Sequence, residues 1–179
     1  PARPDIPALD ERYGRYLELH PASWEATIHE HSSWSCIHGV ERWRADCGCA
    51  PGGESHQRWR APLREALDWL RDRLAPLYEE LGAPLLGDVW AARDAYIDVV
   101  LDRAPETVSS FLERCAGRTL SAGEQVQALR LLELQRHALL MFTSCGWFFD
   151  ELSRIETTQI LRYASRAIQL ARQVGGPDL

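Results

Sequence analysis

The stretch "SAGEQVQALRLLELQRHALL" (Ser121–Leu140) decides the fold class of this 179-residue chain. Ser121 and Glu124 form an S-x-x-E capping box, in which each side chain satisfies a free backbone amide at the start of a helix. Apolar residues then recur at helical spacing, at Val126, Leu129, Leu132, Leu139 and Leu140. The pattern predicts a long helix. We expect it to be interrupted in "MFTSCGWFFDEL" (Met141–Leu152), where small polar residues and a glycine precede three aromatic residues.

Further helices are predicted on both sides of this one. An earlier helix carries Leu63, Leu67, Leu70, Leu74 and Leu77. Pro62 is expected at its first position, and Pro76 is expected to end or kink it near its last turn. The other predicted helices cover about Val89–Leu101, Glu106–Cys115 and Thr157–Val174, with Pro105 and Gly117 bounding the second of these.

No segment shows the alternation typical of a strand, so the expected class is all-α. We expect a helical bundle of about five to six helices with an irregular Cys/Trp-rich N-terminal segment. Residues 1–31 are predicted to be an irregular lead-in, and residues 32–179 a helical domain. The chain starts with Pro1 rather than methionine, which suggests a piece of a longer polypeptide.

The bulk composition excludes several function classes. The formal net charge is −6, whereas a protein that follows a phosphate backbone usually carries a basic stripe, so no nucleic-acid partner is expected. No apolar run approaches the roughly 20 residues of a membrane span, so no membrane partner is expected either. Five cysteines are an odd number and do not form a small disulfide framework. We therefore expect reduced thiols and a cytoplasmic location.

The segment "SSWSCIHGVERWRADCGC" (Ser32–Cys49) concentrates possible metal ligands. Cys36-x-His38 and Cys47-x-Cys49 are two pairs separated by eight residues, and each could present both side chains to zinc or to an iron–sulfur centre. Gly48 would let the backbone fold tightly around an ion. Ligands in zinc sites are usually spaced more widely within a pair. Two alternatives therefore stay open: buried free cysteines that pack as small apolar residues, and redox-active or disulfide-bonded cysteines.

Other residues support weaker interpretations of the sequence. His29, His31 and Cys145 are possible additional metal ligands. Glu133 and His137 lie one helical turn apart, but their spacing departs from the Glu-x-x-His of di-iron bundles. A thiol enzyme would need Cys36 or Cys145 beside a histidine, and no pattern in the sequence fixes that geometry.

The interrupted segment is the second candidate site. Aromatic rings bind the apolar faces of sugars and carboxylates bind their hydroxyl groups, so Trp147, Phe148, Asp150 and Glu151 are candidate substrate-binding residues of a glycan cleft. The alternative is that the aromatic residues fill the core between helices while the acids face solvent.

Three segments carry a family resemblance: the Cys/Trp-rich segment Ser32–Cys49 quoted above, "WAARDAYIDVVLDR" (Trp90–Arg103) and "LLMFTSCGWFFDELSRIETTQILRYASRA" (Leu139–Ala167). Together they resemble a bacterial and archaeal domain of unknown function found C-terminal to catalytic domains of glycoside hydrolase family 57 type. The resemblance covers most of the chain from Ser32 to about Ala171.

The resemblance implies a helical accessory domain of a carbohydrate-active protein of α-amylase or 4-α-glucanotransferase type. Its partners would be the N-terminal catalytic domain of the same chain, a (β/α)7-type barrel, and an α-glucan whose cleft it helps to shape. In that family the catalytic carboxylates come from the barrel, and these 179 residues show no barrel strand pattern. No catalytic residue is therefore expected in this chain.

Overall fold

The computed structural model describes residues 29–33, 36–49 and 56–179 of the chain. The chain divides into two units, residues 1–32 and residues 33–179, and the helices described here belong to the second. The described residues form helices and no strand, which confirms the predicted all-α class. No helix among them is both long enough and apolar enough to cross a membrane.

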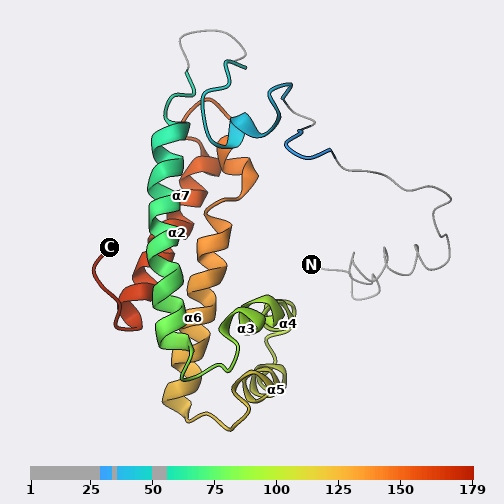
Figure 1. Cartoon of the computed structure of the whole chain (residues 1–179), viewed down its shortest axis with the longest axis vertical. Coiled ribbons are helices and arrows are strands. Elements are labelled where there is room, and N and C mark those ends of the chain that lie inside the picture. The colour runs from blue at the N-terminus through green and yellow to red at the C-terminus, as the bar shows by residue number, and fades with distance from the viewer. Residues whose placement is uncertain (1–28, 34–35, 50–55) are drawn as a thin grey trace, which may run out of the picture. The chain divides into compact units, whose positions relative to one another are not determined.

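Three long helices form the body of the bundle: α2 (Arg60–Gly82), α6 (Ala122–Leu140) and α7 (Ile155–Gln173), which pack against one another (Figure 1). The sequence neighbours Leu131 and Leu132 on α6 are both buried, so α6 is covered on more than one face. The predicted capping box is present at its start. The N–H of Ser121 donates to Glu124 Oε2 (2.8 Å), and the N–H of Glu124 donates to Ser121 Oγ (3.4 Å).

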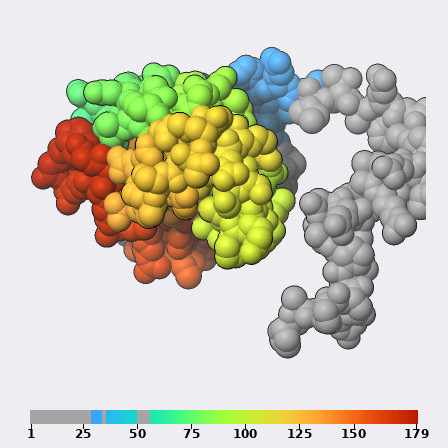
Figure 2. Space-filling view, turned by 90° about the horizontal axis from the view of Figure 1, so that it is seen from below, coloured from blue at the N-terminus to red at the C-terminus, as the bar shows by residue number. Residues whose placement is uncertain are grey.

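Three shorter helices lie at the end of the bundle where α6 begins: α3 (Val89–Ala95), α4 (Ile97–Leu101) and α5 (Pro105–Ala116) (Figures 1 and 2). The single helix predicted over 89–101 is thus divided at Tyr96. This residue is buried, and its hydroxyl donates to Glu133 of α6 (2.8 Å). Gly117 ends α5 as predicted, with a left-handed backbone (φ 65°) that favours glycine.

The long helix α2 does not end at Pro76, as one alternative of the prediction had it; it continues to Gly82. Pro62 also lies at the third helical position rather than the first. Beyond Pro76, Tyr78 is fully buried and its hydroxyl donates to the carbonyl of Val89 (2.5 Å). This tertiary packing outweighs the helical hydrogen bond that proline cannot make.

The other end of the bundle holds two 3₁₀ turns, η1 (Gly39–Trp43) and η2 (Ser144–Trp147), which contact each other (Figure 1). The predicted interruption between the last two long helices is therefore present. Gly146 lies against α7 so closely that a Cβ atom there would stand 2.5 Å from Ile160 Cγ2. The hydroxyl of Thr157 on α7 donates to the carbonyl of Gly146 (2.7 Å), which holds η2 on the bundle.

Candidate metal centre

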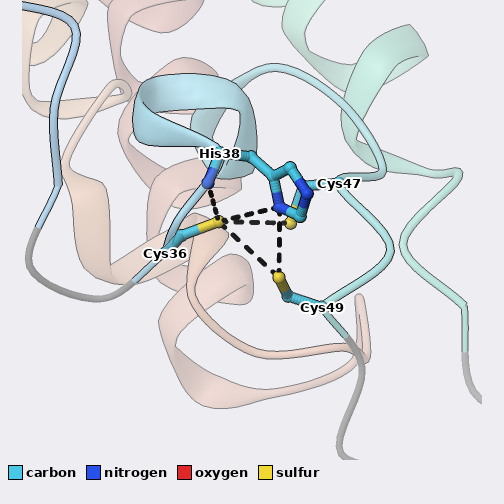
Figure 3. Close-up of side chains that lie close together, drawn as sticks. All are labelled: Cys36, His38, Cys47 and Cys49. Carbon is cyan, nitrogen blue, oxygen red and sulfur yellow. Dashed lines mark hydrogen bonds between the residues drawn. The ribbon is translucent and has the colours of Figure 1, made fainter.

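Four side chains from the segment 36–49 converge on one point (Figure 3). The Sγ atom of Cys36 lies 3.7 Å from that of Cys47 and 3.8 Å from that of Cys49. The Nδ1 atom of His38 lies 3.6 Å from Cys36 Sγ and 3.3 Å from Cys49 Sγ. All four ligand atoms lie within 4.8 Å of one another.

These distances can be compared with those around one tetrahedral ion. With Zn–S bonds of about 2.3 Å and Zn–N bonds of about 2.0–2.1 Å, tetrahedral angles place two sulfur atoms about 3.8 Å apart and a sulfur and a nitrogen about 3.6 Å apart. Four of the six pairwise separations, at 3.3–3.8 Å, match this geometry, and all six are within 4.8 Å. A cluster of several irons divides its ligands among different metal atoms, which separates the ligands further. The donor set therefore fits a single zinc ion.

The backbone around the group explains how short-spaced pairs can share one ion. Gly48 has a left-handed backbone (φ 75°), and its N–H donates to Asp46 Oδ1 (3.0 Å), which tightens the turn between Cys47 and Cys49. The expectation that Gly48 allows a tight fold is confirmed. A turn also joins the other pair, since the N–H of Gly39 donates to the carbonyl of Cys36 (3.2 Å).

The environment of Cys36 favours a thiolate, the form that binds metal. Burial alone would raise the pKa of this thiol, but hydrogen bonds with the backbone N–H and ring of His38 and with the side chains of Cys47 and Cys49 outweigh burial. They lower the pKa of Cys36 to about 6. The pKa of Cys49 is raised, chiefly by its hydrogen bond with Cys36. Cys36 thus gives up its proton before Cys49 does.

The group is joined to the bundle through Gln57, which is fully buried. Its Nε2 donates to the carbonyl of Cys49 (3.2 Å) and to a carboxylate oxygen of Asp150. Its Oε1 accepts from the thiol of Cys47 (3.6 Å) and from Arg60 Nη1 (2.5 Å). One side chain therefore connects two of the four candidate ligands to the start of α2 and to the segment that follows η2.

Two tryptophans and an arginine add further hydrogen bonds between the same segments. Trp43 Nε1 donates to the carbonyl of Ser144 (3.2 Å), and Trp59 Nε1 donates to the carbonyl of Asp150 (2.9 Å). Arg42 Nη1 donates to the carbonyl of Phe148 (3.3 Å). The two candidate regions of the sequence, about 100 residues apart, thus form one end of the molecule.

Of the possible additional metal ligands, Cys145 lies in the same unit as the group. Cys145 is exposed and does not belong to the four converging residues, although its segment contacts theirs. The interpretation of Cys145 as an additional metal ligand is therefore wrong. His29 and His31 belong to the other unit of the chain. On α6, Glu133 is held by Tyr96, Arg103 and Arg136, which makes it part of a polar network between helices.

The four candidate substrate-binding residues have different environments. Trp147 is fully buried, and its ring stacks on Trp59 with ring centres 6.0 Å apart. Trp147 therefore packs in the core, in agreement with the alternative interpretation that the aromatic residues fill the core between helices. The guanidinium of Arg42 lies 4.9 Å from the ring centre of Phe148. Asp150 is half-buried and Glu151 is exposed. Sugar binding by Phe148, Asp150 and Glu151 stays a prediction.

Sequence reasoning missed three residues of this site, Arg42, Gln57 and Arg60, all of them buried. A signal existed for one of them. Arg60 lies seven residues before Leu67, two helical turns away on the same buried stripe of α2. A charged residue at an apolar position of a helical repeat indicates a buried polar contact.

The sequence model of one protein family, described as a domain of unknown function (DUF3536), matches residues 56–179 of the chain. The four converging Cys and His residues precede that segment, whereas Gln57, Arg60 and Asp150 lie within it. No curated protein and no solved structure matches the chain. Because the matched segment covers well over half of the 179 residues, the chain belongs to the DUF3536 family.

Proposed function

We propose that this chain is a zinc-stabilised helical domain in which Cys36, His38, Cys47 and Cys49 hold one structural zinc ion. The observation that carries the proposal is the set of ligand distances, which fits a tetrahedral ion. Four protein ligands leave no open position for a substrate or water, and such closed sites are structural rather than catalytic.

The ion would fix the segment 36–49 on the end of the bundle. This segment has few buried apolar side chains of its own, and its contacts to the bundle are mainly hydrogen bonds made by Gln57, Trp43 and Arg42. Metal binding in small modules contributes about 10–16 kcal/mol of apparent free energy at neutral pH. Because three of the ligands must stay reduced, a reducing compartment such as the cytoplasm is part of this proposal.

The test measures zinc content and thermal unfolding of the full chain. We expect about one zinc per chain, and a strong chelator should lower Tm. Cys47→Ser should lose most of the zinc. Cys145→Ser is the matched control, since Cys145 is exposed at the same end of the bundle and outside the group. A wild-type chain without zinc after expression in zinc-supplemented medium, or full zinc occupancy in Cys47→Ser, would contradict the proposal.

A second candidate function is an accessory role beside a catalytic domain of glycoside hydrolase family 57 type, with an α-glucan as ligand. It is supported by the resemblance of the three quoted segments and by the family match over 56–179. Three large apolar side chains are exposed in segments at the end of the bundle that holds η1 and η2: Ile37, Leu152 and Ile155. In this proposal they are contact points for the catalytic domain.

This role is tested by calorimetry with maltooligosaccharides on the chain alone and joined to such a catalytic domain. Phe148→Ala and Glu151→Gln should weaken binding. Glu113→Gln is the control, because Glu113 is an exposed acid on α5, at the opposite end of the bundle. Equal affinity in all variants, or no binding in either form of the protein, would reject the glucan ligand. Trp147 is unsuited to this test because its substitution would disturb the core.

A further inference from the structure

Two buried arginines lie beside the Cys/His group, and no carboxylate of the described residues forms an ion pair with either of them. Arg60 is 0% exposed and Arg42 is 8% exposed. None of the ion pairs among the described residues involves either of them. Arg60 donates to the carbonyls of Phe148 and Phe149 (3.2 Å each) and to Gln57, which are neutral groups. The Nε atoms of both arginines are buried and have no hydrogen-bond partner.

A buried guanidinium loses its hydration, so a folded protein normally supplies a negative charge nearby. Asp150 is one such charge, since its carboxylate binds the same Gln57 side chain that binds Arg60. A single carboxylate offsets only one of the two guanidiniums. A second negative charge near Arg60 would offset the other guanidinium.

The Cys/His group lies where that charge is needed. Gln57 Oε1 contacts both Cys47 Sγ (3.6 Å) and Arg60 Nη1 (2.5 Å), so Arg60 is separated from the candidate ligands by one side-chain atom. Burial lowers the pKa of the Arg60 guanidinium. The negative charges of Cys47 and Asp150 oppose this shift, whereas the positive charge of Arg42 reinforces it. Three thiolates and a neutral imidazole around a divalent ion carry one net negative charge. This charge and Asp150 together balance the two arginines.

We propose that Arg60, separated from Cys47 by a single atom of Gln57, is the counter-charge of an anionic zinc–thiolate centre. The inference rests on the proposed function, because neutral thiols without an ion would leave one of the two buried guanidiniums without a counter-charge among the described residues. Arg60 is a positioning residue in this arrangement: it touches no ion itself, and it raises the affinity of the site for a divalent cation held by three thiolates.

Arg60 also connects the Cys/His group to the end of the bundle. The start of α2 carries Arg60, and the same guanidinium holds the carbonyls that follow η2. Zinc binding, the charge of Arg60 and the packing of the segment after η2 are therefore coupled. A change in one should appear in the others.

The experiment compares zinc affinity in the full chain by competition with a chromophoric chelator. Arg60→Met keeps much of the side-chain volume and removes the charge, and it should weaken zinc binding by about tenfold or more, as substitutions next to metal ligands do. Arg60→Lys should restore most of the affinity. Arg71→Met is the control, since Arg71 lies about three turns further along α2, is exposed, and already pairs with Asp68 and Asp72.

The outcomes separate this inference from the proposed function. Wild-type zinc affinity in Arg60→Met would overturn the role of Arg60 as counter-charge. An equal loss of Tm in the zinc-free and zinc-bound forms would also overturn it, because the substitution would then act only through the packing of the side chain. Absence of zinc binding in the wild-type chain would overturn the zinc site itself. Should Arg60→Met fail to fold, Arg60→Gln makes the same comparison, with weaker zinc binding expected and unchanged binding overturning the inference.

Discussion

Gly146→Ala tests the close contact between η2 and α7. Gly146 is buried and does not have a positive φ, so alanine can adopt its backbone conformation. The added Cβ would lie 2.5 Å from Ile160 Cγ2 and 2.9 Å from Ile160 Cδ1. Ile160 is 1% exposed, so its side chain cannot move into solvent. The substitution therefore forces either Ile160 or η2 to shift.

The expected cost follows from two opposing effects. Overpacking a core costs about 1–3 kcal/mol. Replacing glycine by alanine restricts the unfolded chain and returns about 0.4–1 kcal/mol. We expect a net destabilisation of about 1–2 kcal/mol, which lowers Tm by about 2–8 °C for a chain of this size. Denaturant and thermal unfolding followed by circular dichroism measure both quantities.

Two further variants show whether the contact is the cause. Gly123→Ala is the control, because a Cβ atom at Gly123, in the first turn of α6, would meet nothing within 4 Å, and this variant should be neutral or slightly stabilising. In an Ile160→Ala background the clash is removed, so adding Gly146→Ala should cost almost nothing. If Gly146→Ala were as harmless as Gly123→Ala, or cost the same in both backgrounds, the steric argument would be refuted.

Two other predictions concern polar contacts of the bundle. Ser121→Ala removes the capping box and should destabilise the chain by about 1 kcal/mol in denaturant unfolding. Ser165→Ala, on the exposed face of α7, is the control and should change the free energy of unfolding by less than about 0.5 kcal/mol. Equal effects of the two substitutions would contradict the capping argument. Burial would raise the pKa of Glu133, but its bonds to Arg103 and Tyr96 outweigh burial, so its folded-state pKa is depressed. The stability it contributes is therefore present above its unfolded pKa and lost as pH falls through the folded value. Glu133→Gln should flatten the acid limb of stability against pH, and an unchanged slope would reject this role.

Local signals in the sequence predicted the three long helices and the four candidate ligands that lie close together. Apolar spacing and the Ser121 capping box depend on neighbours within one or two turns, so they predict helices without knowledge of the rest of the fold. The pairs that contain Cys36 and Cys49 are likewise close in sequence, and Gly48 between the last two ligands indicated the turn that brings them together.

The tertiary structure alone decided which residues surround the ligands. Trp147 is buried because Trp59, which lies 88 positions earlier, stacks on it, and no periodicity of either segment reveals that pairing. Cys145 stays exposed although its segment contacts η1. Arg60 finds its environment only where α2, the Cys/His segment and the residues after η2 meet. Burial and charge balance depend on which distant segments pack together, and that information is absent from any short stretch of the chain.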